Sequence, residues 1–401
     1  MAKPKIRFKG YQDDWEQRKL SEIAIRVTEK NKNNEFTEPF TNSAELGIIS
    51  QKEYFEREIV NDENLDGYYI VRKDDFVYNP RISGTAPVGP INRNRLEKNG
   101  VMSPLYTVFR VHDIADLYLE YYFKTTNWHR FMKLNGDSGA RFDRFTISST
   151  QFMEMPIPYP KVEEQKKIGA YFDHLDHLIT LHQRKCEEVK KLKKFMLQKM
   201  FPQNGSRVPE IRFDGFTDDW EQRKFGSLLD ETRNKTSVED EDILLSCAIN
   251  GMYLNSELFS HFRGASNVGY LKIKKNDLIL SAQNLHLGNC NVNLRFEHGI
   301  ISPAYKVYEL VGCNPLFMQA WVKRDSTKNF FLRASTEGAS VCRKNIVWEE
   351  LYKQELIIPD IEEQKRIGAY FDHLDHLITL HQQKCDDLKN LKKYMLQNMF
   401  A

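Results

Sequence analysis

The chain spells one unit of about 200 residues twice, and this internal repeat limits its fold more than any other feature. The stretch YFDHLDHLITLHQRKC begins at Tyr171, and YFDHLDHLITLHQQKC begins at Tyr370, with a single difference. PKIRFKGYQDDWEQRK from Pro4 likewise matches PEIRFDGFTDDWEQRK from Pro209. We therefore expect the fold of the first half to occur again in the second.

The two copies have diverged unevenly. Between Glu163 and Phe201, 31 of 39 positions are identical to those 199 residues later, whereas segments 24–150 and 230–350 match only at scattered positions. The diverged segments mix short alternating runs, such as LYTVFRV and AYKVYEL, with helix-like stretches, such as IADLYLEYYFKTTNWHRFM and PLFMQAWVKRDSTKNFF. Each diverged segment predicts a compact α+β domain.

The retained segment predicts one long helix in each copy, because it has no Pro and is rich in Leu, Lys, Glu and Gln. At 1.5 Å per residue each helix is about 58 Å long. Apolar residues recur at spacings of three and four, so we expect the two helices to pack along these positions as an antiparallel pair. The expected seam is Ile168, Phe172, Leu175, Ile179, His182, Cys186, Val189, Leu192 and Met196, against Ile367, Phe371, Leu374, Ile378, His381, Cys385, Leu388, Leu391 and Met395.

We therefore predict an α+β fold in which an antiparallel coiled coil of two long helices separates two globular domains, related by an approximate two-fold axis. The domain boundaries follow from the repeat and from the linker-like QNGSR. The first domain covers residues 1–158 and its helix 159–202. The second domain covers 203–357 and its helix 358–401.

The amino-acid composition alone does not identify the class of molecule that the chain binds. Lys and Arg number 58 against 56 Asp and Glu, so any nucleic-acid surface must be local. The start MAKPKIRFKG is charged, and no run approaches the roughly 20 apolar residues of a membrane span, so we expect a cytoplasmic protein. Six cysteines without a CxxC pair predict buried thiols.

Motifs that look catalytic are better explained as structural. Asn79-Pro80-Arg81-Ile82 approaches an amino-methyltransferase motif, but it lacks the aromatic residue and a glycine-rich cofactor loop. Pro359-Asp360 with the following Glu-Gln-Lys has the letters of a nuclease site, yet these residues stand together at a helix start. No GxxxxGK[ST] occurs, so we expect no nucleotide hydrolysis by this chain. The acidic residues of the first helical turns (Glu163, Glu164, Glu362, Glu363) are expected to offset the helix dipole, as are lysines at the opposite end (Lys190, Lys191, Lys193, Lys194).

His182 with Cys186, and His381 with Cys385, have the i, i+4 spacing of metal ligands on one helix face. A zinc site is one interpretation. We favour a polar step in the helix seam that fixes register. The neighbouring Asp173, His174, Asp176 and His177 are expected to form a solvated face.

A duplicated unit with two dissimilar domains and two nearly identical long helices resembles the specificity subunit of a type I restriction-modification system. The resemblance covers essentially the whole chain. It rests on the repeated order of three elements: Trp-Glu at Trp15 and Trp220, Ser-Pro-x-Tyr at Ser103 and Ser302, and Glu-Gln-Lys-x-Ile at Glu164 and Glu363 before the long helix.

The resemblance implies that each domain is a target recognition domain that reads one half of a split DNA sequence. The helices would set the spacing, with half-sites roughly one duplex turn, about 34 Å, apart. They would also present a platform for two methylation subunits, through which the restriction and translocation subunits join. The system that the resemblance implies serves bacterial defence. In it this chain would catalyse nothing and would hold no metal or cofactor, while the partner subunits would use S-adenosylmethionine, ATP and Mg2+.

Base readout needs Arg, Lys, Asn or Gln at base edges, with other polar groups on phosphates. We expect DNA contacts from residues that flank strand ends or the loop that contains Gly136 and Gly139. In the first domain these are Gln51, Tyr78, Asn79, Arg81, Arg141 and Arg144, with counterparts Asn250, Gln283, Asn284, Ser340, Arg343 and Lys344 in the second.

Other repeated residues are expected to be structural: Trp15 and Trp220 in the cores, and Ser103-Pro104 and Ser302-Pro303 in turns. The rival function is a non-catalytic interaction scaffold, with two protein-binding domains on a coiled coil and no nucleic acid. A DNA-modifying enzyme is a third and weaker interpretation. Duplex binding that weakens with added salt separates the first two functions.

Overall fold

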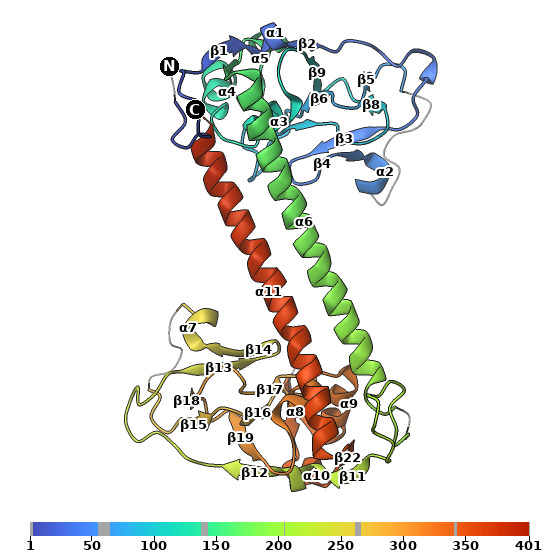
Figure 1. Ribbon diagram of the computed structural model, residues 1–401, viewed down its shortest axis with the longest axis vertical. Coiled ribbons are helices and arrows are strands. Elements are labelled where there is room, and N and C mark those ends of the chain that lie inside the picture. The colour runs from blue at the N-terminus through green and yellow to red at the C-terminus, as the bar shows by residue number, and fades with distance from the viewer. Residues whose placement is uncertain are drawn as a thin grey trace. The chain divides into compact units, whose positions relative to one another are not determined.

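The computed structural model describes residues 3–54, 65–137, 143–203, 205–260, 266–340 and 343–400, with the backbone alone for 337–340 and 343. It divides into two compact units, residues 1–182 with 384–401, and residues 183–383. Each unit contains one α+β domain and parts of both long helices, α6 (Val162–Lys199) and α11 (Ile361–Met399) (Figure 1). The predicted domains left each helix undivided, whereas these units divide both helices near their middles.

The first unit is built on a four-stranded antiparallel sheet of order β2-β9-β6-β7, with three two-stranded pairs around it, β1-β10, β3-β4 and β5-β8. Short helices pack beside these strands. The strands are β1 (Glu16–Lys19), β2 (Ala24–Arg26), β3 (Phe40–Ser43), β4 (Gly47–Ser50), β5 (Tyr69–Val71), β6 (Phe76–Tyr78), β7 (Ile91–Arg93), β8 (Gly100–Met102), β9 (Thr107–Val111) and β10 (Pro156–Tyr159). The short helices are α1 (Leu20–Ile23), η1 (Lys32–Asn34), α2 (Gln51–Tyr54), α3 (Asp116–Phe123), α4 (His129–Asn135) and α5 (Ser149–Met153).

The second unit repeats this topology. Its four-stranded sheet has the order β12-β19-β16-β17, and the pairs β11-β22, β13-β14 and β15-β18 correspond to those of the first unit. The strands are β11 (Glu221–Lys224), β12 (Leu229–Thr232), β13 (Leu245–Ala248), β14 (Gly251–Leu254), β15 (Leu271–Lys274), β16 (Leu278–Ser281), β17 (Cys290–Val292), β18 (His298–Ile301), β19 (Tyr305–Leu310), β20 (Ser335–Ser340), β21 (Arg343–Ile346) and β22 (Glu355–Ile358). The short helices are η3 (Phe225–Leu228), α7 (Asn255–Leu258), η4 (Leu285–Leu287), α8 (Pro315–Val322), α9 (Asp325–Arg333) and α10 (Trp348–Lys353). The α+β prediction is confirmed for both copies.

The central strands form because their residues are apolar, aromatic or β-branched and are buried on both faces. All three residues of β6 and all four of β16 are buried. Phe76 of β6 stacks on Phe109 of β9 with ring centroids 5.4 Å apart. One face of each sheet packs on the helices, and the other face packs on the pairs β3-β4 and β5-β8 in the first unit and β13-β14 and β15-β18 in the second.

The two helix-like stretches of the sequence are each broken in two. α3 ends before Lys124 and α8 ends before Lys323, and each lysine occupies the C-cap position. The turn after Phe123 brings Trp128 back, so that its indole N–H donates to the Phe123 carbonyl at 3.1 Å. Each break therefore holds a lysine at a helix end, where the sequence pattern alone predicted a continuous helix.

A buried ion pair joins each long helix to the N-terminal segment of its copy. Both carboxylate oxygens of Glu164 accept hydrogen bonds from the Arg7 guanidinium, at 2.6 and 2.8 Å, and the Glu164 side chain is fully buried. Glu363 binds Arg212 in the same way, at 2.8 and 2.7 Å. The prediction that these carboxylates only offset the helix dipole is therefore incomplete, since both are buried and paired.

The glutamine after each glutamate connects the same helix to the short helices. Gln165 accepts from the Ala115 backbone N–H at 2.9 Å and donates to the Pro160 carbonyl at 2.8 Å. Gln364 makes the equivalent bonds to Asn314 and to the Pro359 carbonyl, both at 2.8 Å. The repeated Glu-Gln thus fixes the start of each long helix against two other parts of its domain.

Contacts between the helices show that they run antiparallel within each unit. In the first unit Phe172 stacks on Phe400, and Asp176 pairs with Lys392 at 2.5 Å. In the second unit the copies exchange roles, and Asp375 pairs with Lys193 at 2.5 Å. The prediction of a solvated acidic face is therefore incomplete for Asp176, whose side chain is 40% exposed but also pairs across the helices.

Asp173 is solvated as predicted, with a side chain that is 44% exposed, and it also pairs with Arg95 at 2.9 Å. His174 and His177 are exposed, as predicted.

The predicted seam is confirmed at most buried positions, Cys186, Cys385 and Leu388 among them, and is wrong at Leu192 and Leu391. Ile168, Phe172, Leu175 and Ile179 are buried, but Leu192 is 43% exposed and Leu391 is 42% exposed. A straight α-helix has 3.6 residues per turn and drifts away from a strict 3.5-residue repeat, so neighbouring residues replace these leucines at the contact.

Several structural predictions are confirmed. Trp15 and Trp220 are 3% and 1% exposed and pack in the two cores. Ser103 and Ser302 begin turns, closed by bonds from the Tyr106 and Tyr305 N–H groups at 3.0 and 3.1 Å. The five described cysteines are buried free thiols, and Cys342 lies outside the described residues. Across the described part of the chain, no helix is both long and apolar enough to cross a membrane.

Replacing Glu164 with Gln should lower the free energy of unfolding by about 3 kcal/mol, because Arg7 would lose its buried counter-charge. Thermal or urea unfolding of the full chain measures this. Glu163→Gln is the matched control, since Glu163 is exposed in the same helical turn and should change stability by less than about 0.5 kcal/mol. Equal effects of the two variants would show that the buried pair contributes nothing special.

Replacing Gly368 with Ala should destabilise the chain, although Ala is the better helix former. An added Cβ would lie 2.7 Å from the Cβ of Leu316 and 2.7 Å from the Phe317 nitrogen. We expect a loss of about 1–3 kcal/mol from this overlap in unfolding experiments. Ala369→Gly at the exposed neighbouring position should cost only about 1 kcal/mol, and a stabilising Gly368→Ala would contradict the close packing.

Candidate nucleic-acid interface

In the first unit, the loop that follows β6 lies against the segment before α5. Arg81 and Arg144 are antiparallel bridge partners, and the Ile82 N–H donates to the Asp143 carbonyl at 3.0 Å. Arg81 is exposed, and Arg144 lies 4.0 Å from the carboxylate of Asp143. Two of the predicted DNA-contacting arginines are therefore neighbours at one edge of the domain.

The second unit builds the same arrangement from different side chains. The loop after β16 contains Gln283, Asn284 and η4, and the Lys344 N–H donates to the Gln283 carbonyl at 3.2 Å. Burial and the charge of Lys344 both lower the pKa of His286 in this loop. Gln283, Asn284 and Lys344 are thus brought together, where the first unit has two arginines.

Two predictions in the first unit change once the contacts are known. Tyr78 is only 2% exposed, donates to the Val88 carbonyl at 2.9 Å and stacks on Phe152. Its role is in the core, and the prediction that it contacts DNA conflicts with this burial. Asn79 is half-buried and donates to the Asn42 carbonyl at 2.8 Å while accepting from the Arg81 N–H at 3.0 Å, so it shapes the loop.

Gln51 and Asn250 lie apart from these loops, and they are not counterparts of each other. Gln51 begins α2 directly after β4 and donates to the Phe40 carbonyl at 3.1 Å. The residue in the equivalent place after β14 is Asn255. Asn250 is instead exposed in the turn between β13 and β14. The pairing was wrong because the offset between the copies is larger at these hairpins than at the helices.

Three predicted residues are described incompletely. Arg141 lies outside the described residues. Ser340 and Arg343 are backbone partners in the β20-β21 pair, which stands where the first unit has its Arg144 segment. They remain predictions.

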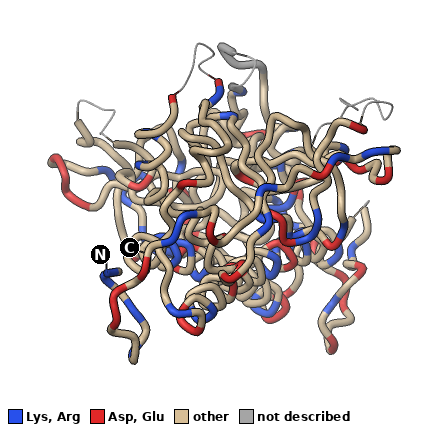
Figure 2. The backbone as a smooth tube through the Cα atoms, turned by 90° about the horizontal axis from the view of Figure 1, so that it is seen from above, with Lys and Arg blue, Asp and Glu red and all other residues tan. Residues whose placement is uncertain are grey.

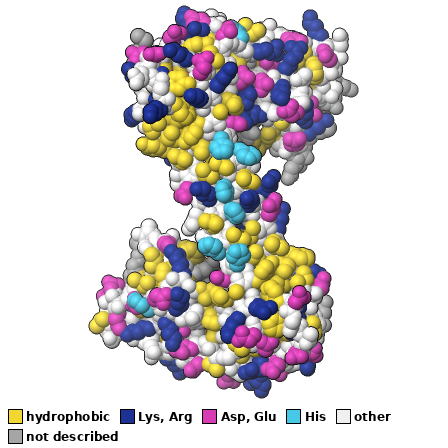
Figure 3. All heavy atoms as spheres, in the orientation of Figure 1, with side chains coloured by type: hydrophobic (Ala, Val, Ile, Leu, Met, Phe, Trp, Pro, Cys, Tyr) yellow, Lys and Arg dark blue, Asp and Glu magenta, His cyan; other side chains and the backbone are white. Residues whose placement is uncertain are grey.

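Charge is distributed without a dominant sign. Lys and Arg alternate with Asp and Glu along the backbone (Figure 2), and both signs are interspersed over the visible surface of the domains (Figure 3). A local site therefore has to be found from individual contacts. One such feature was missed by the sequence predictions: a basic cavity in each unit, lined by Lys124 in the first and by Lys323 in the second. The signal was one lysine kept in both diverged domains, directly after an apolar helix.

The helix histidines and cysteines give no sign of a metal centre. Cys186 is 3% exposed, and its thiol lies 3.8 Å from the Ile378 carbonyl. Among the described residues, no three His, Cys, Asp or Glu side chains are grouped to hold a metal ion. The polar step in the helix seam stays a prediction.

Comparison with known proteins shows which proteins this chain is similar to. Residues 12–191 match the family model described as type I restriction modification DNA specificity domain. The putative type I restriction enzyme MjaX specificity subunit of Methanocaldococcus jannaschii is 23% identical over 305 residues, 70% of this chain and 65% of that protein, so the match spans just under two-thirds of that relative. The MjaVIII specificity subunit of the same organism is 21% identical over 84% of this chain and 86% of its own.

A solved structure agrees with the fold. The S subunit of a type I restriction-modification system from M. genitalium is 11% identical, with a TM-score of 0.60 over 100% of this chain and 99% of that one. At this identity the likeness concerns the fold alone. By these comparisons the chain is similar to type I restriction enzyme specificity subunits, and its residues 12–191 match the DNA specificity domain of that family.

Proposed function

We propose that the chain is the sequence-specific, non-catalytic DNA-binding subunit of a type I restriction-modification complex. Each α+β domain would read one half of a bipartite duplex target. The observation that carries this proposal is the loop after β6 and its counterpart after β16. They occupy the same place in the same fold, yet one presents Arg81 and Arg144 and the other Gln283, Asn284 and Lys344.

The chemistry of these side chains supports base readout. Arg and Lys donate to guanine, and Asn and Gln make paired bonds to adenine, so two loops of different composition suit two different half-sites. The sheets beneath them have identical topology and hold the loops on rigid strand ends. Variation confined to the loops would change the target without changing the fold.

The long helices would set the distance between half-sites and dock two methylation subunits. Their near-identity supports this assignment, because a surface that meets the same partner twice must be kept twice. In this proposal the methylation subunits supply S-adenosylmethionine chemistry, and the restriction subunits, joined through them, use ATP and Mg2+. The chain itself would choose the sequence, in the cytoplasm where the host DNA lies.

Exchanging segment 24–150 for that of another specificity subunit should change one half of the modified sequence and leave the other half and the gap unchanged. The measurement is a genome-wide map of methylated adenines after co-expression with the cognate methylation subunit. Exchange of 230–350 is the matched control and should change the other half only. An interaction scaffold without DNA recognition would yield no sequence motif, and a change in both halves would contradict independent domains.

Replacing Arg81 with Ala should relax the specificity of one half-site, at a cost of about 1–3 kcal/mol per lost base contact. Gln283→Ala should relax the other half instead. Arg72→Ala is the control, since Arg72 pairs with Glu29 outside the loop and should leave the sequence motif unchanged. Loss of specificity in both halves from either loop variant would argue against one loop for each half-site.

A further inference from the structure

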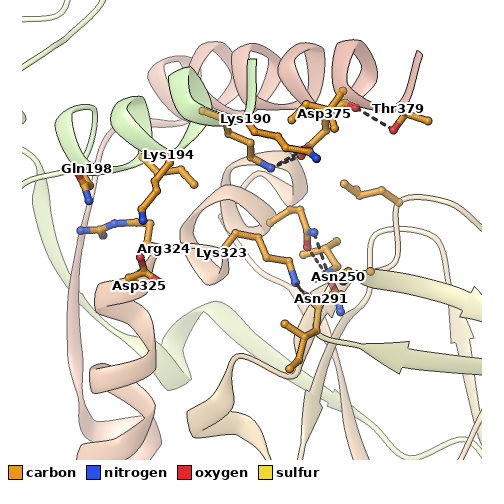
Figure 4. A pocket seen from close by; sticks show the side chains of 18 of the residues that line it. Lys190, Lys194, Gln198, Asn250, Asn291, Lys323, Arg324, Asp325, Asp375 and Thr379 are labelled. Atoms are coloured by element: carbon orange, nitrogen blue, oxygen red, sulfur yellow. Dashed lines mark hydrogen bonds and ion pairs between the residues drawn. The ribbon is translucent and has the colours of Figure 1, made fainter. Parts of the chain in front are cut away.

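Each unit contains a cavity that is bordered by segments of both long helices. Its other wall is the break after α3 in the first unit and the break after α8 in the second. The cavity of the second unit has a volume of about 1290 Å³ and is bordered by α6, α11, the α8–α9 junction and the β13-β14 turn (Figure 4). The cavity of the first unit has about 600 Å³ and lies at the α3–α4 break.

The two cavities are built from equivalent residues. Lys190, Lys193 and Lys194 of α6 border the second-unit cavity, and the lysines 199 positions later, Lys389, Lys392 and Lys393, border the first-unit cavity. The opposite wall carries Lys323 in one and Lys124 in the other. These two lysines belong to the diverged domains, where few positions match, so the likeness extends beyond the retained helices.

Positive charge exceeds negative charge in both cavities. Among the described lining residues, the second-unit cavity has seven basic and three acidic side chains, and the first-unit cavity has four lysines and one aspartate. Asp375 pairs with Lys193 at 2.5 Å in the second-unit cavity, and Asp176 pairs with Lys392 at 2.5 Å in the first. Each aspartate therefore neutralises one of the three helix lysines. Lys194 and Lys393 form no ion pair with any described residue, so their charge stays uncompensated.

The wall lysines point their ammonium groups at uncharged acceptors. Lys323 donates to the carbonyls of Ile249 and Cys290 at 2.7 and 2.9 Å, and Lys124 donates to the side-chain oxygen of Asn92. Burial disfavours the charged form and lowers the pKa of both lysines. Part of the Lys124 side chain is nevertheless exposed in the cavity. An incoming anion would relieve the cost of holding these cations without a counter-charge.

Arg324 adds to the second-unit cavity. Its Nε is buried without a hydrogen-bond partner, and its guanidinium lies 4.6 Å from the centre of the Phe201 ring. Burial lowers its pKa to about 10. The equivalent residue of the first unit is Thr125, so this position supplies a cation in the second cavity alone.

We infer that these two cavities bind phosphates of the DNA backbone, one cavity for each recognition domain, and supply the part of the affinity that does not depend on sequence. A site repeated in both domains can recognise only what two different half-sites share, and that is the sugar-phosphate backbone. Lysine acts as a point charge toward phosphate, which suits this role. The inference rests on the proposed function, because it requires a duplex to be bound.

The test is the salt dependence of binding to a 30-base-pair duplex that lacks the target sequence. The chain is used at full length, in complex with its methylation subunits. The test variant combines Lys194→Gln with Lys393→Gln, both at exposed and unpaired lysines. The control combines Lys185→Gln with Lys384→Gln, which makes the same charge change on the same helices with exposed lysines that border neither cavity.

The test variant should bind the duplex roughly tenfold more weakly at fixed salt. The slope of log affinity against log salt should fall by about 0.9 for each lost phosphate contact, or about 1.8 in all. The control should keep the slope of the unmodified complex, and the methylated sequence motif should be the same in all three proteins.

Equal losses in the test variant and the control would overturn the inference, since they would indicate general charge attraction. Unchanged duplex affinity with impaired complex assembly would also overturn it, by assigning the cavities to an acidic surface of a methylation subunit. Failure of the unmodified complex to bind any duplex would instead defeat the proposed function itself.

Discussion

The buried ion pair between Arg7 and Glu164, repeated as Arg212 and Glu363, is the interaction on which the rest of each unit depends. A fully buried carboxylate is costly unless both oxygens are bound, and here one guanidinium binds both of them at the positive end of a helix. Together with the adjacent glutamine, it fixes the direction in which the long helix leaves its domain.

Because this ion pair fixes the start of each long helix, the strands, loops and helices of a unit differ in how much sequence change they tolerate. Apolar strands such as β6 and β16 tolerate exchange of one buried residue for another, provided that volume and alternation are kept. Loops at the strand ends tolerate still more, because they lie at the surface. The helices tolerate least, since Asp176 with Lys392 and Asp375 with Lys193 must match across the pair. The uneven divergence of the two copies follows from these three levels of constraint.

The repeat made the fold predictable, because any element proposed for one copy could be checked in the other. It also singled out Arg81 and Arg144 as candidate DNA contacts, whereas their being neighbours was learned from the structure. The burial of Tyr78 could not be foreseen, since a strand end reveals neither its inward face nor the Phe152 ring that stacks on it. Leu192 was predicted to lie in the helix contact but is exposed, because the face of an α-helix that meets its partner shifts gradually around the helix. Lys124 and Lys323 escaped notice, although one lysine kept in two diverged domains was a usable signal.

The central claim is that the loops after β6 and β16 each meet a different half of one duplex target. Photo-crosslinking tests it most directly, using the assembled complex on its mapped target with a photoreactive thymine analogue placed in one half-site at a time. The account predicts crosslinked peptides from residues 79–90 or 137–146 for one half. For the other half it predicts peptides from residues 282–289 or 335–346. Crosslinks from both loops to the same half-site, or crosslinks confined to the long helices, would contradict it.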